Sequence, residues 1–102
     1  MQKTKLEIPK EGIEAFCRKW RVKEFSLFGS ALRDDFRPDS DVDVLVELRP
    51  DHGLDLYDWV DMIDELREMF GREVDLVEKT AIRNPFRRHE ILRNHEVIYA
   101  AR

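Results

Sequence analysis

Apolar residues recur at helical spacing in two parts of the chain, and a third segment is also expected to be helical. From Ile13 to Trp20 they fall at i, i+3, i+4 and i+7, which places them on one face of a helix. A second stripe ends just before Gly71, a residue that often terminates helices. A third helix is expected to begin after Pro85. The residue before a proline disfavours helix, so Asn84-Pro85 marks a boundary. The predicted helices span roughly 9–20, 56–70 and 86–94.

Three other segments have the pattern of β-strands, namely 22–28, 41–48 and 73–77. In 41–48 the valines at even positions alternate with Asp41, Asp43 and Glu47. Residues 97–99 are expected to form a short extended or packed end. A helix between the second and third strands predicts that these strands are parallel, whereas the shorter link between the first two allows antiparallel pairing. The predicted fold is α/β, with a mixed sheet of three or four strands packed by helices.

Polar residues at the strand ends suggest a site for phosphate and metal. Asp41 and Asp43 are two residues apart in a strand, so their side chains project from the same face. Paired carboxylates repel each other, and a hard cation with oxygen ligands offsets that repulsion. The turn at Gly29-Ser30 offers backbone N–H groups and a hydroxyl, which suit phosphate. Asp75 stands between apolar residues in the third strand, where a carboxylate is costly without a partner.

Length and composition favour one folded domain, residues 1–102. Apolar residues make up 42% of the chain, and the net charge of −4 argues against direct nucleic-acid binding, which needs a basic surface. We find no signal peptide and no apolar run near the roughly 20 residues of a membrane span. The single Cys17 lies on the stripe of the first helix and is expected in the core. These features predict a soluble cytoplasmic protein.

Other metal-binding and nucleotide-binding motifs do not fit. Asp39, Asp41 and Asp43 have the spacing that opens a calcium loop, but Val44 follows where that loop needs glycine. His89 and His95 are six residues apart rather than the four of a zinc-binding helix, and we expect all three histidines at the surface. The sequence contains no Walker A loop and no GxGxxG motif.

The remaining pattern is Gly29-Ser30, ten intervening residues, then Asp41-Val42-Asp43, with Asp75 later in the chain. It resembles the Gly-Ser-x10-Asp-x-Asp signature of the minimal nucleotidyltransferases, which belong to the DNA polymerase β-like superfamily. Arg33 also matches an arginine of that family. The resemblance covers residues 22–78 and implies a polymerase β-like fold. Two departures are Leu32, where a smaller residue is common, and the acidic pair at 34–35.

The resemblance implies a nucleotidyltransferase that uses ATP and two Mg²⁺ ions. Asp41, Asp43 and Asp75 are then the catalytic and metal-binding residues. By the same resemblance, Gly29, Ser30 and Arg33 are the nucleotide-binding residues.

Similar small proteins are encoded beside HEPN-domain ribonuclease toxins and act as their antitoxins. The resemblance therefore implies AMPylation: AMP passes from ATP to a hydroxyl of the HEPN toxin, in particular a tyrosine, within a hetero-oligomer. An alternative is a non-catalytic antitoxin or nucleotide-sensing module that neutralises its partner by binding. Transfer to a small molecule is disfavoured, because 102 residues leave little chain for an acceptor pocket.

Overall fold

The computed structural model describes residues 8–32 and 40–101, with Ser30 and Ala31 described by their backbone alone. Three helices, four strands and two short 3₁₀ helices make up this part of the chain. In chain order they are α1 (Lys10–Lys19), β1 (Val22–Phe28), η1 (Gly29–Leu32), β2 (Val42–Leu48), α2 (Leu56–Phe70), β3 (Val74–Glu78), η2 (Lys79–Ala81), α3 (Pro85–Arg93) and β4 (His95–Ala100). Every predicted helix and strand is present within one or two residues of its expected bounds, and the extended end is a fourth strand.

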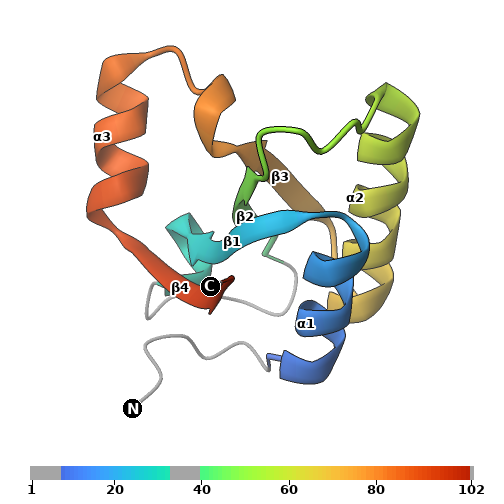
Figure 1. The fold of residues 1–102 in the computed structure, drawn as a ribbon. Helices are drawn as coiled ribbons and strands as arrows, with labels where there is room; N and C mark the ends of the chain where they lie inside the picture. Colours follow the sequence, from blue (N-terminus) through green and yellow to red (C-terminus); the bar gives the residue numbers. More distant parts are fainter. Residues whose placement is uncertain (1–7, 33–39, 102) are drawn as a thin grey trace.

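The four strands form one mixed sheet in the order β3-β2-β1-β4 (Figure 1). β1 pairs antiparallel with β2 and with β4, whereas β2 and β3 are parallel and are linked through α2. The predicted mixed sheet and the predicted directions of the β1–β2 and β2–β3 pairs are therefore confirmed.

One face of the sheet carries the main hydrophobic core. α1 and α2 lie on this side, as Figure 1 shows, and they bury Phe16 and Leu66 against Phe25 and Val44 of the strands. Cys17 belongs to the same core and is 1% exposed, and burial raises the pKa of its thiol to about 12. This confirms the predicted structural role of the cysteine, because a nucleophilic cysteine needs a lowered pKa.

Among the described residues, the opposite face is covered by α3 and by Ile82 of the segment before it. Ile91 of α3 packs on Phe28 and Leu45, which form a second, smaller core. Arg88 fixes the helix to the preceding segment, because its guanidinium donates a hydrogen bond of 2.8 Å to the backbone oxygen of Lys79. The thin cover on this face leaves room for recesses at both ends of α3.

Local sequence explains the bounds of α2. Asp55 accepts a hydrogen bond from the backbone N–H of Asp58 at 2.9 Å, and the Asp58 carboxylate accepts one from the backbone N–H of Asp55 at 3.0 Å. This reciprocal pair is a capping box. Gly71 ends the helix with a φ of 67°, a left-handed conformation that glycine adopts without strain. Within the described residues, no helix is long and apolar enough to cross a membrane.

Candidate active site

Three strands bring the candidate residues into one row across the sheet. Asp43 of β2 pairs directly with Phe28 of β1 on one side and with Asp75 of β3 on the other. Directly paired residues project from the same face of a sheet. This is the face that carries Leu45 and is covered by α3. The carboxylates of Asp43 and Asp75 therefore lie on neighbouring strands at the same level.

Asp41 immediately precedes β2 and lies two residues from Asp43. Asp41 and Asp75 are exposed, whereas Asp43 is half-buried. Of the three carboxylates, Asp43 is thus the most enclosed by the protein, and the other two flank it towards solvent.

Gly29 begins η1 directly after β1 and lies against Asp43. Its φ of +64° lies in the left-handed region that favours glycine. A Cβ atom built at this position would overlap the Oδ2 atom of Asp43 and would lie 3.2 Å from its Cγ. The turn therefore requires glycine both for its backbone conformation and for the close approach of the carboxylate.

Two other predicted site residues are described incompletely or not at all. Ser30 is the second residue of η1, and its backbone follows Gly29 into that turn. Arg33 lies outside the described residues. The structure thus brings together Gly29, Asp43 and Asp75, with Asp41 beside them and the backbone of Ser30 next to the glycine.

The candidate carboxylates supply the oxygen donors that Mg²⁺ prefers. Their register on adjacent strands fits a shared cation in donor type and in placement. In residues 8–32 and 40–101, however, no three His, Cys, Asp or Glu side chains are gathered closely enough to form a complete metal cage. Carboxylates repel one another, so a cation is needed to draw them together.

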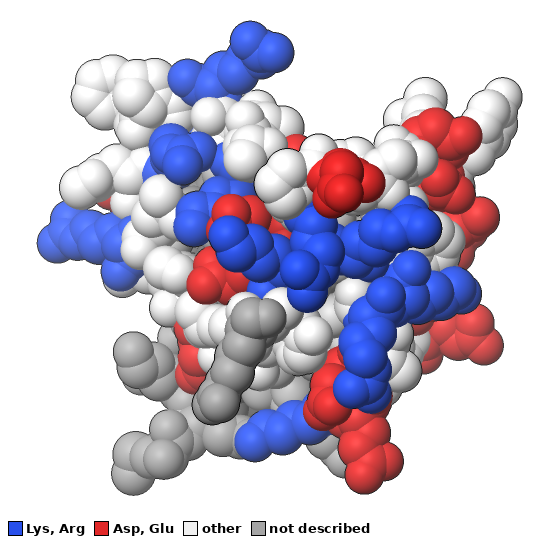
Figure 2. Space-filling model, in the orientation of Figure 1, with Lys and Arg blue, Asp and Glu red and all other residues white. Residues whose placement is uncertain are grey.

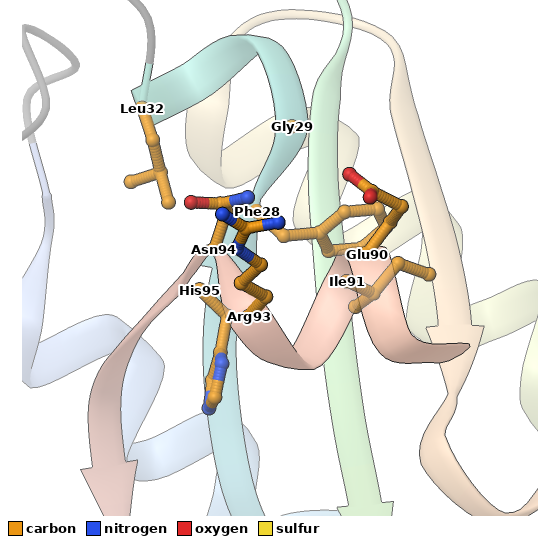
Figure 3. Close-up of a pocket in the computed structure, with 8 residues that line it drawn as sticks. All are labelled: Phe28, Gly29, Leu32, Glu90, Ile91, Arg93, Asn94 and His95. Carbon is orange, nitrogen blue, oxygen red and sulfur yellow. The ribbon is translucent and has the colours of Figure 1, made fainter. Parts of the chain in front are cut away.

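A pocket of about 480 Å³ opens beside the Gly29 turn (Figure 3). Phe28, Gly29 and Leu32 line one side. The other side comes from the end of α3 and the start of β4, namely Glu90, Ile91, Arg93, Asn94 and His95. Figure 3 shows the polar ends of Glu90, Arg93 and Asn94 reaching towards the turn. The pocket thus combines an apolar floor with a cation, an amide and a carboxylate, a mixture typical of small-molecule sites.

Sequence reasoning predicted the helix that carries these residues but not their place in a pocket. Glu90, Arg93 and Asn94 are three and four positions apart, a spacing that places side chains on one helix face. That spacing was the available signal. His95, expected at the surface, is half-buried at the pocket, and its Nδ1 lies 2.8 Å from the backbone oxygen of Leu92.

Residues 9–98 match a known family, described as the nucleotidyltransferase domain. Two curated relatives illustrate the similarity. A provisionally named protein adenylyltransferase of Methanocaldococcus jannaschii is 32% identical over 79% of both chains. The protein adenylyltransferase MntA of Thermococcus cleftensis is also 32% identical, over 79% of this chain and 77% of the relative.

Solved structures share the fold. A toxin–antitoxin structure with AMP-PNP superposes with a TM-score of 0.74, at 18% identity, over 92% of this chain and 75% of that one. A structure named as a minimal nucleotidyltransferase gives a TM-score of 0.70 at 29% identity, over 85% of this chain and 86% of that one. The complex of a tri-AMPylated HEPN toxin of Shewanella oneidensis with an MNT antitoxin gives a TM-score of 0.64 at 17% identity. The match covers 90% of this chain and 70% of that one.

Proposed function

Because the chain belongs to the nucleotidyltransferase domain family, we propose that it transfers AMP from ATP to a hydroxyl group of a protein. The observation that carries the proposal is the close approach of the Gly29 turn to Asp43, with Asp75 in register on the next strand. A nucleotidyl transfer needs phosphate ligands and metal ligands at one place. The end of the sheet where β1 stops and β2 begins offers both. Adenylyltransferases among the relatives support the reaction type.

The nucleotide is assigned to the pocket beside Gly29. Gly29 lets the backbone approach the phosphates closely, and Ser30 and Arg33 act with it as nucleotide-binding residues. Arg93 adds a positive charge on the other wall of the pocket, where it can pair with phosphate oxygens. Asn94 offers both a donor and an acceptor to the adenine ring.

Asp41, Asp43 and Asp75 would hold the two Mg²⁺ ions. When bound, these ions neutralise phosphate charge and make the acceptor hydroxyl easier to deprotonate. The acceptor oxygen forms a bond to the α-phosphorus, and the bond from that phosphorus to pyrophosphate breaks. Asp75, exposed at the edge strand, accepts the proton of the hydroxyl. The remaining task of the protein is to position the groups and balance their charge.

The acceptor is assigned as a HEPN-domain ribonuclease toxin, modified on a tyrosine and thereby silenced. The AMPylated HEPN toxin of Shewanella oneidensis, in complex with an antitoxin of the same fold, supports this assignment. So does MntA of Thermococcus cleftensis, which is named as a protein adenylyltransferase. The chain would then act as an antitoxin in a hetero-oligomer with its target.

Transfer of radiolabel from α-labelled ATP to the HEPN protein, with Mg²⁺ present, tests the assignment of the carboxylates. Asp41→Asn and Asp43→Asn should each lower the rate about 100-fold or more, because each removes a negative charge that would hold the Mg²⁺ ions. Asp75→Asn should also be impaired. Asp61→Asn is the matched control, since Asp61 is an exposed carboxylate of α2. Equal labelling by wild type and the two catalytic variants would exclude the proposed site.

A further inference from the structure

A groove of about 530 Å³ runs along β3, on residues separate from those that line the nucleotide pocket. Leu54 and Trp59 line it from the side of α2, and Ile82 lines it from the segment before α3. Consecutive residues of β3, from Asp75 to Glu78, form its floor. β3 is an edge strand of the sheet, and exposed edges are ready to receive another chain unless they are covered.

Large apolar side chains stand exposed at positions next in sequence to residues that line the groove. On α2, Leu56 is 75% exposed and Val60 is 50% exposed, and each directly follows a residue that lines the groove, Asp55 and Trp59. Phe86, in the first turn of α3, is 82% exposed. Figure 2 shows uncharged side chains interspersed with charged ones over the starts of both helices, with a dip in the surface between them. Exposed apolar side chains gathered around a groove are typical of an interaction surface.

The polar residues of the groove define the charge of its occupant. Asp55, Asp75 and Glu78 line it, and the basic side chains of the lining are Arg87 and His52. The Glu78 carboxylate accepts a hydrogen bond of 3.0 Å from the backbone N–H of Thr80, and Asp55 is fixed in the capping box of α2. The acids are thus held in place at the groove. A segment with basic residues beside apolar ones complements this surface.

Asp75 belongs both to the groove and to the carboxylate row of the candidate site. A protein in the groove therefore lies directly beside the residue assigned to receive the acceptor proton. We propose that this groove docks the acceptor protein of the transfer reaction, through a segment that carries apolar side chains flanked by basic ones. The inference rests on the proposed function. The two recesses share no lining residue, as simultaneous binding of nucleotide and acceptor requires.

The test measures the affinity of purified HEPN-domain protein from the same genome for wild type, Val60→Lys and Phe86→Lys. Each groove variant should weaken binding about tenfold or more, as loss of an apolar anchor at an interface does. Val97→Lys is the matched control, because Val97 is 45% exposed on β4, at the opposite edge of the sheet. AMP-PNP should bind all four proteins equally, which shows that the variants are folded.

Each outcome decides the docking proposal. Weaker binding by both groove variants, with Val97→Lys like wild type, supports it even when no AMP is transferred; in that case the proposed function fails and the docking site holds. Wild-type affinity in both groove variants overturns the docking site, and so does an equal loss in Val97→Lys. Absence of any binding between wild type and the HEPN protein overturns it as well.

Discussion

At the scale of the residue, Gly29 connects a backbone conformation to the chemistry of a neighbouring strand. The residue combines a positive φ with the close approach of the Asp43 carboxylate. Gly53 has a similar φ of +68°, but an added Cβ there would meet nothing within 4 Å. An alanine at Gly53 therefore adds backbone strain alone, whereas an alanine at Gly29 adds the same strain and also displaces Asp43.

Gly53→Ala should destabilise the protein by about 1 kcal/mol, because alanine is strained at positive φ, and Gly29→Ala should destabilise it by at least as much, because its methyl group also overlaps Asp43. Gly29→Ala should in addition reduce AMP transfer at least about tenfold, because its methyl group displaces a carboxylate that the reaction needs in place. Urea unfolding and a labelled-transfer assay measure the two effects. Equal transfer by the two variants would show that contact with Gly29 does not position Asp43.

The carboxylate row was predictable because strand periodicity and strand direction are local properties. Alternation in 41–48 placed Asp41 and Asp43 on one face, and the helix between the strands predicted the parallel neighbour that carries Asp75. The contact of Gly29 with Asp43 was not predictable in detail, since it depends on how the turn after β1 packs against β2. The role of Arg33 remains a prediction from family resemblance.

At the scale of the element, α3 links the nucleotide pocket to the rest of the fold. It is a short helix with one buried residue, Ile91, so packing alone holds it weakly. Its start is fixed by Asn84, whose Oδ1 accepts hydrogen bonds from the backbone N–H groups of Phe86 at 2.9 Å and Arg87 at 3.2 Å. The sequence predicted this helix over 86–94, one residue later than its observed bounds at both ends. It did not predict the pocket, because a pocket depends on side chains of remote elements meeting in space.

Removal of this cap should loosen the pocket from a distance. Asn84→Ala should cost about 1 kcal/mol of stability, because two backbone donors lose their acceptor. AMP-PNP affinity should fall with it, since Arg93 and Asn94 at the other end of α3 line the pocket. Asn84→Asp keeps an acceptor oxygen and should retain both properties. Titration calorimetry measures the AMP-PNP affinity, and urea unfolding measures the stability. Unchanged affinity in a destabilised Asn84→Ala protein would show that the pocket does not depend on the helix cap.

At the scale of the whole molecule, unequal cover of the two sheet faces creates the recesses. In the described part of the chain, α1 and α2 close one face over the main core, whereas a single helix, α3, lies on the other (Figure 1). One recess opens beside Gly29 at the C-terminal end of α3. The other follows edge strand β3 and lies near the N-terminal end of α3. Between them lies the row of Asp43 and Asp75. This arrangement suits a transferase that receives its nucleotide from one side and its acceptor from the other.

The central claim is that the chain modifies its partner covalently, and the intact mass of that partner tests it most directly. The HEPN protein is incubated with wild type, ATP and Mg²⁺, with Asp43→Asn as the inactive control. We predict that its mass increases by one or more AMP groups with wild type only, and that its ribonuclease activity falls in parallel. A HEPN protein silenced in a stable complex at unchanged mass would contradict the transfer and favour neutralisation by binding.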